Sequence, residues 1–291
     1  IDRLKDNDSM VAYEKLAAEL NVLPEIDYER VTLMKWEYLK AVFLQSGKKT
    51  LNSSGFKEFF KANREWLEPY AAYCCLRDIY ETPDFRKWKM YSVFNPDDIA
   101  EFCACGNIYY DKVSFYYFVQ YHLHIQLLEV RDYAHAKGIV LKGDIPIGVS
   151  RDSVDAWSHP ELFYMDSQAG APPDDFSVEG QNWGFPTYNW DEMAKDGYTW
   201  WKARFRKMAE YFDAYRIDHI LGFFRIWEIP ERAIQGVLGH FNPAIPFSIE
   251  ELQSYGFYFD EHRHAHPYIR EYMLQSLFGE YAGEVIHDYL L

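Results

Sequence analysis

The chain has 291 residues, of which 48% are hydrophobic and 26% charged, and a formal net charge of −15 at pH 7. This is an ordinary globular composition, and no apolar run approaches the roughly 20 residues of a membrane helix. An acidic surface repels phosphate backbones and anionic lipids, which excludes nucleic acid and membranes as partners and favours a neutral substrate.

The first residues, Ile1 to Asp6, contain no Met and do not resemble a signal peptide. We therefore expect the chain to be part of a longer protein. The four cysteines, Cys74, Cys75, Cys103 and Cys105, lack the usual zinc spacing. They are interpreted as free thiols, mostly buried, and a cytoplasmic location is expected.

The first 140 residues have helical periodicity. Apolar residues recur at helical spacing in 30–45, Ser54 is a candidate N-cap, and Asn95-Pro96 has the favoured order for a helix start. The predicted helices span 9–20, 30–45, 54–75, a segment starting at 96, and 111–137, the last ending at Gly138.

The pattern then changes to that of a parallel α/β protein. A short strand at 139–141 ends at Gly143-Asp144, and a loop of about 45 residues follows, over 145–190. A helix over 200–212 leads to a second strand, 214–217, which ends at Asp218. Both aspartates would thus lie at carboxyl ends of parallel strands, which is where α/β folds place their active sites. Further helices are predicted at 230–240, 248–255 and 267–279.

Asp218 is the strongest candidate for a reactive carboxylate. Arg216 lies two positions earlier, so both side chains should point to one side of the strand. A neighbouring guanidinium keeps a carboxylate ionised, as the nucleophile of a retaining glycosidase must be. Taken alone, the pattern is more typical of a structural salt bridge at a strand end than of a nucleophile.

The surrounding motifs add context, and together they resemble the 4-α-glucanotransferases, the amylomaltase and disproportionating-enzyme family (glycoside hydrolase family 77). The tail over 241–246 resembles the cytosolic plant-type subgroup. In chain order the motifs are Gly143-Asp144-Ile145-Pro146-Ile147, Asp152-Ser153, Trp157, His159-Pro160-Glu161, Pro172-Pro173-Asp174, Phe176, Gly180-Gln181-Asn182-Trp183-Gly184, Pro186, Tyr188, Arg216-Ile217-Asp218-His219 and Trp227-Glu228-Ile229-Pro230.

This resemblance implies a fold and a set of residue roles. The fold is α/β: part of a (β/α)₈ TIM barrel over 138–291, with active-site loop 145–190, and a large, mainly helical insertion over 1–137. The activity is transfer of α-1,4-glucan units with retention. The matching positions are Asp218 as nucleophile, Arg216 as the residue that holds it, Asp144 and His219 as sugar-ring ligands, and Phe176, Gln181 and Trp183 on a mobile loop over the acceptor.

One required group is not found. A retaining glycosidase needs two carboxylates about 5 Å apart, and the family's acid/base lies in an Ala-Glu-Asp-Leu-Gly-like stretch that this sequence lacks. We therefore expect a partial barrel that has no transferase activity by itself. Trp157, Trp190 and Glu228 are interpreted as structural residues rather than ligands.

Two other functions remain open at this point. A non-catalytic maltooligosaccharide-binding module would keep the aromatic loop without the acid/base. A metal-dependent hydrolase built on Asp144, Asp218 and His219 is disfavoured because no His-x-His or His-Glu-x-x-His pattern occurs. The expected partners are maltooligosaccharides or other α-glucans, with no cofactor and no metal, and open edges of a partial barrel would allow oligomers.

Overall fold

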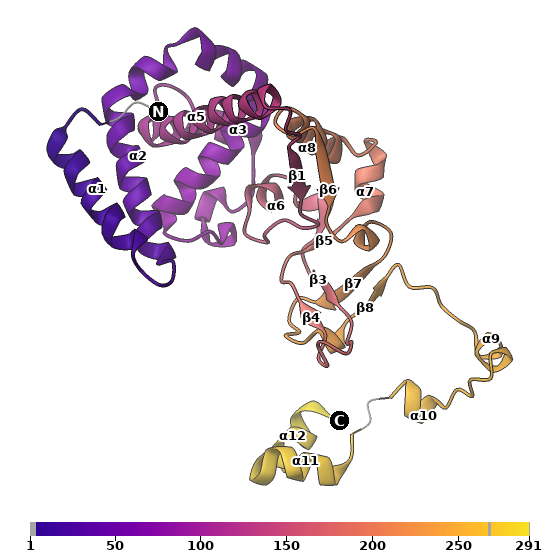
Figure 1. Cartoon of the computed structure of the whole chain (residues 1–291). Coiled ribbons are helices and arrows are strands. Elements are labelled where there is room, and N and C mark those ends of the chain that lie inside the picture. The colour runs from indigo at the N-terminus through magenta and orange to yellow at the C-terminus, as the bar shows by residue number, and fades with distance from the viewer. Residues whose placement is uncertain (1–3, 267–268, 291) are drawn as a thin grey trace. The chain divides into compact units, whose positions relative to one another are not determined.

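The computed structural model describes residues 4–266 and 269–290 (Figure 1). The chain divides into two compact units, Ile1–Pro243 and Ala244–Leu291. The predicted boundary at residue 137, between a helical insertion and a partial barrel, lies inside the first unit and stays a prediction.

The N-terminal part of the first unit is helical (Figure 1). A side-chain oxygen caps the start of each of the four N-terminal α-helices, supplied by Asp6, Asp27, Ser53 and Asn95. The predicted cap Ser54 was wrong by one residue. The elements are α1 (Asn7–Asn21), α2 (Tyr28–Leu51), α3 (Ser54–Tyr80), the 3₁₀ turns η1 (Phe85–Lys87) and η2 (Lys89–Tyr91), α4 (Pro96–Phe102) and α5 (Tyr110–Ala136).

An aromatic core joins these helices to the later segment that carries Trp157. Trp157 is 1% exposed, packs against Tyr73 and Trp88, and donates its indole N–H to the Tyr91 carbonyl at 2.9 Å. Its interpretation as a core residue is therefore confirmed. These contacts anchor the segment carrying Trp157 in the helical core. Removing its ring would leave a large cavity there.

Two short parallel strands follow, β1 (Lys142–Ile145) and β6 (Ala214–Ile217). The second strand lies where the sequence predicts it. The first begins three residues later than predicted, so Asp144 lies within the strand rather than after it. The helix before β6, α8 (Thr199–Ala209), ends earlier than predicted.

The segment predicted as a long loop, 145–190, contains regular structure. Part of it pairs with residues 226–242 in an antiparallel sheet of order β4-β3-β7-β8. The predicted helix over 230–240 is wrong: strands lie at both ends of this segment, and only the short 3₁₀ helix η5 (Gly236–Leu238) lies between them. The elements are α6 (Val154–Ser158), η3 (Pro160–Leu162), β2 (Phe163–Tyr164), β3 (Ser167–Ala171), β4 (Gln181–Asn182), β5 (Thr187–Tyr188), α7 (Trp190–Lys195), η4 (Ile220–Phe223), β7 (Ile226–Pro230), η5 (Gly236–Leu238) and β8 (His240–Asn242).

The second unit consists of short helices. Ser248 and Glu251 form a capping box at α9, as expected for a helix near 248–255. The helix predicted over 267–279 is observed from Glu271, and Pro267 lies outside the described residues. The elements are α9 (Ile249–Ser254), α10 (Glu261–His264), α11 (Glu271–Phe278), η6 (Gly279–Tyr281) and α12 (Ala282–Tyr289). No helix in the described part of the chain is long and apolar enough to cross a membrane.

Candidate active site

The register of β1 and β6 places an acidic and a basic residue opposite each other. Asp144 pairs with Arg216 in the parallel ladder. The Arg216 guanidinium donates to both carboxylate oxygens of Asp144, at 3.0 and 2.6 Å. Such a two-point contact fixes both the distance and the plane of the two groups.

Asp218 follows β6 directly and lies beside this pair. Its backbone N–H donates to the Ile145 carbonyl at 3.2 Å. One Asp218 carboxylate oxygen lies 3.7 Å from the Arg216 guanidinium, so the ion pair is looser than the one with Asp144. The sequence correctly places Arg216 near Asp218, but the closer partner of Arg216 is Asp144.

All three charged side chains are accessible to solvent. Their exposed fractions are 54% for Asp144, 60% for Arg216 and 53% for Asp218. The hydrogen bond that Arg216 donates to Asp144, more than the charge of Asp218, raises the pKa of Arg216. The guanidinium therefore stays charged, and solvent screens the field it exerts on Asp218.

His219 and Trp183 form an aromatic contact next to these charges. The two rings lie edge to face with 4.9 Å between centroids. His219 adopts the left-handed backbone conformation (φ 46°), and its ring lies close to Gly222, where a Cβ would come within 2.8 Å of it. A side chain at position 222 would thus displace His219.

Gln181 and Phe185 also contact Trp183. The Trp183 indole N–H donates to the Gln181 side-chain oxygen at 3.0 Å, and its ring stacks on Phe185 with centroids 5.8 Å apart. Sequence reasoning missed Phe185. The available signal was the spacing of Trp183 and Phe185, which places both on one side of an extended segment.

Phe176 does not join this group. Its side chain is 97% exposed. The backbone beside it is held by Asp174, whose carboxylate accepts from the N–H groups of Phe176 and Ser177 at 2.9 and 2.7 Å. Seven site residues are predicted from the sequence. Six of them are linked by the contacts described above, and Phe176 is the one that lies apart.

Gln181 and Trp183 lie on a segment that pairs with β3. Asn182 pairs with Gly170, and the Trp183 N–H donates to the Ala169 carbonyl at 2.9 Å. The buried Gln168 amide reaches across to the Pro230, Glu231 and Ala233 carbonyls, at 3.2, 3.1 and 2.8 Å. Gln181 therefore lies in β4, a strand of the four-stranded sheet, and Trp183 follows this strand directly.

Glu228 is bound within the same sheet. Its carboxylate accepts from the Thr187 hydroxyl at 3.0 Å and from the Asn242 amide at 2.9 Å. These contacts agree with a structural role. Among residues 4–266 and 269–290, no group of three or more His, Cys, Asp or Glu side chains is arranged to hold a metal ion.

Comparison with known families decides the identity of the chain. Glycoside hydrolase family 77, described as 4-alpha-glucanotransferase, matches residues 2–285. The chain belongs to this family. The resemblance inferred from the motifs is thus confirmed.

Relatives of this family 77 chain include enzymes from plants and bacteria. The 4-alpha-glucanotransferase DPE2 of Oryza sativa subsp. japonica is 48% identical over 266 residues, which is 91% of this chain and 28% of the rice protein. The 4-alpha-glucanotransferase of Chlamydia pneumoniae is 36% identical over 210 residues, or 72% of this chain and 39% of that protein. The chain thus spans less than half the length of these relatives.

Two amylomaltase structures have a similar fold. Amylomaltase from Streptococcus agalactiae, solved in complex with acarbose, superposes with a TM-score of 0.68 at 26% identity, over 84% of this chain and 52% of that one. Amylomaltase from Corynebacterium glutamicum gives a TM-score of 0.61 at 22% identity, over 86% and 34%. The mixed α/β class predicted from the sequence agrees with these structures.

Proposed function

We propose that this chain carries the nucleophile side of a 4-α-glucanotransferase active site, with Asp218 as the residue that accepts the glycosyl unit. The observation that carries the proposal is the convergence of Asp144, Arg216 and Asp218 at adjacent parallel strands. Membership of family 77 and 48% identity to the rice enzyme support the same activity.

The proposed fold around the site is part of a (β/α)₈ barrel. In this view β1 and β6 are neighbouring barrel strands, and the helices before residue 137 are an insertion that precedes them. Parallel pairing supports this arrangement, as does the place of Asp218 directly after a strand.

The residues have distinct roles in the proposed reaction. An Asp218 carboxylate oxygen would attack the anomeric carbon while the bond to the leaving sugar breaks and an acid group protonates the leaving oxygen. An acceptor 4-hydroxyl, which loses its proton to the same group, would then displace Asp218 with overall retention. No such acid/base is found in the sequence of this chain, so this proton transfer requires a group that the chain does not supply. Arg216 orients Asp144. The carboxylate of Asp144 and the ring of His219 are both suited to binding sugar hydroxyls. The rings of Trp183 and Phe185 offer apolar faces for sugar stacking.

The proposed substrates are maltooligosaccharides or other α-glucans. Acarbose, an oligosaccharide analogue, is bound in the related amylomaltase structure. We also propose a cytoplasmic location, which four free cysteines support. Open strand edges would allow oligomers.

A donor with a leaving group that needs no protonation tests the nucleophile directly. With α-maltosyl fluoride, a bond forms between Asp218 and the anomeric carbon, and fluoride leaves with the electron pair of the broken bond. We expect one maltosyl group per chain, found by peptide mass spectrometry on the peptide containing Asp218. Maltotriose, whose leaving sugar needs an acid, should give no longer products.

Two variants provide the comparison. Asp218→Asn should lose the label, because a neutral amide is a poor nucleophile. Asp132→Asn, an exposed aspartate on α5 that pairs with Arg131, should keep it. A label on another residue, a label that persists in Asp218→Asn, or no label in the unaltered chain would contradict the proposal.

A further inference from the structure

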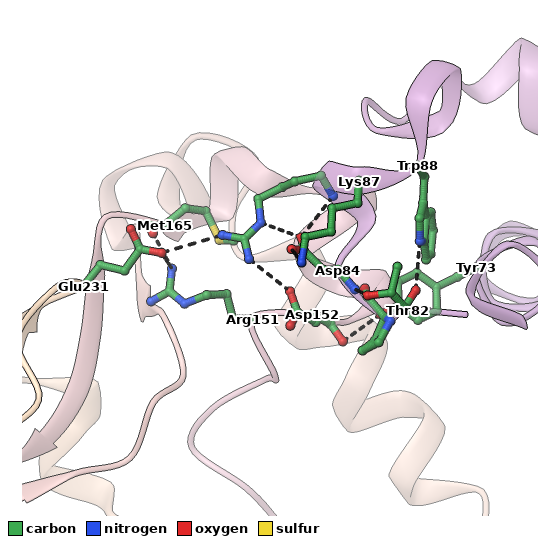
Figure 2. A network of polar contacts seen from close by, with 11 residues as sticks. Tyr73, Thr82, Asp84, Lys87, Trp88, Arg151, Asp152, Met165 and Glu231 are labelled. Carbon is green, nitrogen blue, oxygen red and sulfur yellow. Dashed lines mark hydrogen bonds and ion pairs between the residues drawn. The ribbon is translucent and has the colours of Figure 1, made fainter. Parts of the chain in front are cut away.

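Arg151 lies in the segment that follows β1. Its side chain reaches the backbone at the start of β3. Its side chain is only 13% exposed. The guanidinium donates to the backbone carbonyl of Met165 (Figure 2). It also donates to the Ser167 carbonyl, at 2.6 Å. A planar guanidinium can direct separate N–H groups at two acceptors, which a lysine ammonium does with less defined geometry.

Glu231 compensates the charge of Arg151. It follows β7, and its carboxylate lies 3.6 Å from Arg151 and 3.6 Å from Arg86 (Figure 2). Arg86 also pairs with Asp84 at 2.7 Å and with Asp152 at 3.6 Å. A continuous polar network therefore runs from the turn after α3, through the segment after β1, to the end of β7.

Backbone hydrogen bonds connect β3 to the segment that carries Trp183 and Phe185. The Ala169 carbonyl accepts from Trp183, and the Ala169 N–H donates to the Phe185 carbonyl at 2.8 Å. Trp183 then meets His219. The sequence of contacts is thus Arg151 to the start of β3, β3 to the segment of Trp183, and Trp183 to the residue after Asp218.

We infer that Arg151 is a positioning residue that holds the four-stranded sheet β4-β3-β7-β8, and with it Gln181 and Trp183, against the strand that carries Asp144. The carbonyl contacts matter more than the charge pair, because the pair with Glu231 is long and Glu231 is 41% exposed. Removing Arg151 would also leave the Met165 and Ser167 carbonyls without this donor.

Hydrogen exchange of the complete 291-residue chain tests the structural part. We expect Arg151→Ala to speed amide exchange in segments 167–182 and 226–231 by about tenfold, and Arg151→Lys to give a smaller increase. The amides of α3 and α5 should stay within about twofold of the unaltered chain, since a local release leaves the helical core intact.

Two further variants separate the carbonyl contacts from charge. Glu231→Gln keeps an acceptor and should change exchange little. Arg64→Ala removes an exposed arginine whose ion pair lies within α3, and should leave both sheet segments unchanged. Equal exchange in Arg151→Ala and the unaltered chain would overturn the inference. If Arg151→Ala does not fold, Arg151→Lys provides the test instead. Unchanged amide exchange in the sheet segments of Arg151→Lys would then overturn the inference.

The consequence for sugar binding rests on the proposed function. Maltoheptaose titrated by calorimetry should bind Arg151→Ala about tenfold more weakly than the unaltered chain and Arg64→Ala. If the unaltered chain binds no maltoheptaose, the proposed function is contradicted while the exchange result still decides the role of Arg151. If Arg151→Ala shows faster exchange in the sheet segments but binds maltoheptaose as tightly as the unaltered chain, the positioning role of Arg151 alone is overturned.

Discussion

At the scale of single residues, the charge arrangement around Arg216 depends on two different kinds of geometry. Alternation along β6 places Arg216 and Asp218 on one side of the strand, as the sequence indicates. The pairing of β6 with β1 brings Asp144 closer still. Arg216 therefore acts first as the partner of Asp144, and its influence on Asp218 is secondary.

The cysteines give a residue-scale prediction. Cys74, Cys75 and Cys103 are buried, whereas Cys105 is exposed. Burial raises the pKa of Cys75 to about 12 and that of Cys103 to about 11. Because only the thiolate reacts, labelling of the native chain with a thiol reagent at about pH 8 should modify one cysteine, Cys105.

Two measurements check this prediction. Mass spectrometry should find the single label on the Cys105 peptide, and all four cysteines should react after unfolding in guanidinium. Cys105→Ser should leave the native chain almost unlabelled. Rapid native labelling of Cys75 would show that the helical core is open.

At the scale of elements, short-range signals locate helices well and locate strands less well. Capping side chains and helical periodicity indicate the presence of α1 to α5, although α2 and α3 extend beyond their predicted ends at residues 45 and 75. The segment 226–242 has short apolar runs that fit either a helix or a strand. Pairing with β3, some sixty residues earlier in the chain, selects the strand.

The start of α3 gives an element-scale prediction that separates two adjacent serines. The Ser53 hydroxyl accepts from the Phe56 N–H at 3.2 Å, whereas Ser54 is the first residue of the helix. Ser53→Ala should lower the free energy of unfolding by about 1 kcal/mol. Ser54→Ala should change it by less than about 0.5 kcal/mol.

Urea unfolding followed by circular dichroism at 222 nm measures both variants. The order of the two effects is the decisive result. A larger loss for Ser54→Ala would mean that Ser54 is the capping residue, as the sequence alone suggested.

At the scale of the whole molecule, the chain divides at Pro243 and Ala244. Residues 244–248 are exposed and form no helix or strand. Exposed irregular segments are preferred sites of proteolysis. Brief digestion with chymotrypsin should therefore cut first after Phe247, where an exposed aromatic residue lies in this segment.

Intact-mass analysis of the early products checks this cut. The larger product should end at Phe247, and its packed aromatic cores should resist further digestion. Phe247→Ser should slow the first cut. Early cleavage inside β3 or β7 would contradict the ordered sheet formed by these strands.

The sequence by itself determined the family, the helical N-terminal half, the strand before Asp218 and six of the residues that gather at the candidate site. These signals are local, because periodicity, caps and motifs lie in neighbouring residues. Only the tertiary structure decided that Arg216 binds Asp144, that the Trp183 ring contacts His219, and that Arg151 holds β3. Each of these contacts joins separate segments of the chain, and strand register, which no local pattern specifies, sets which side chains meet.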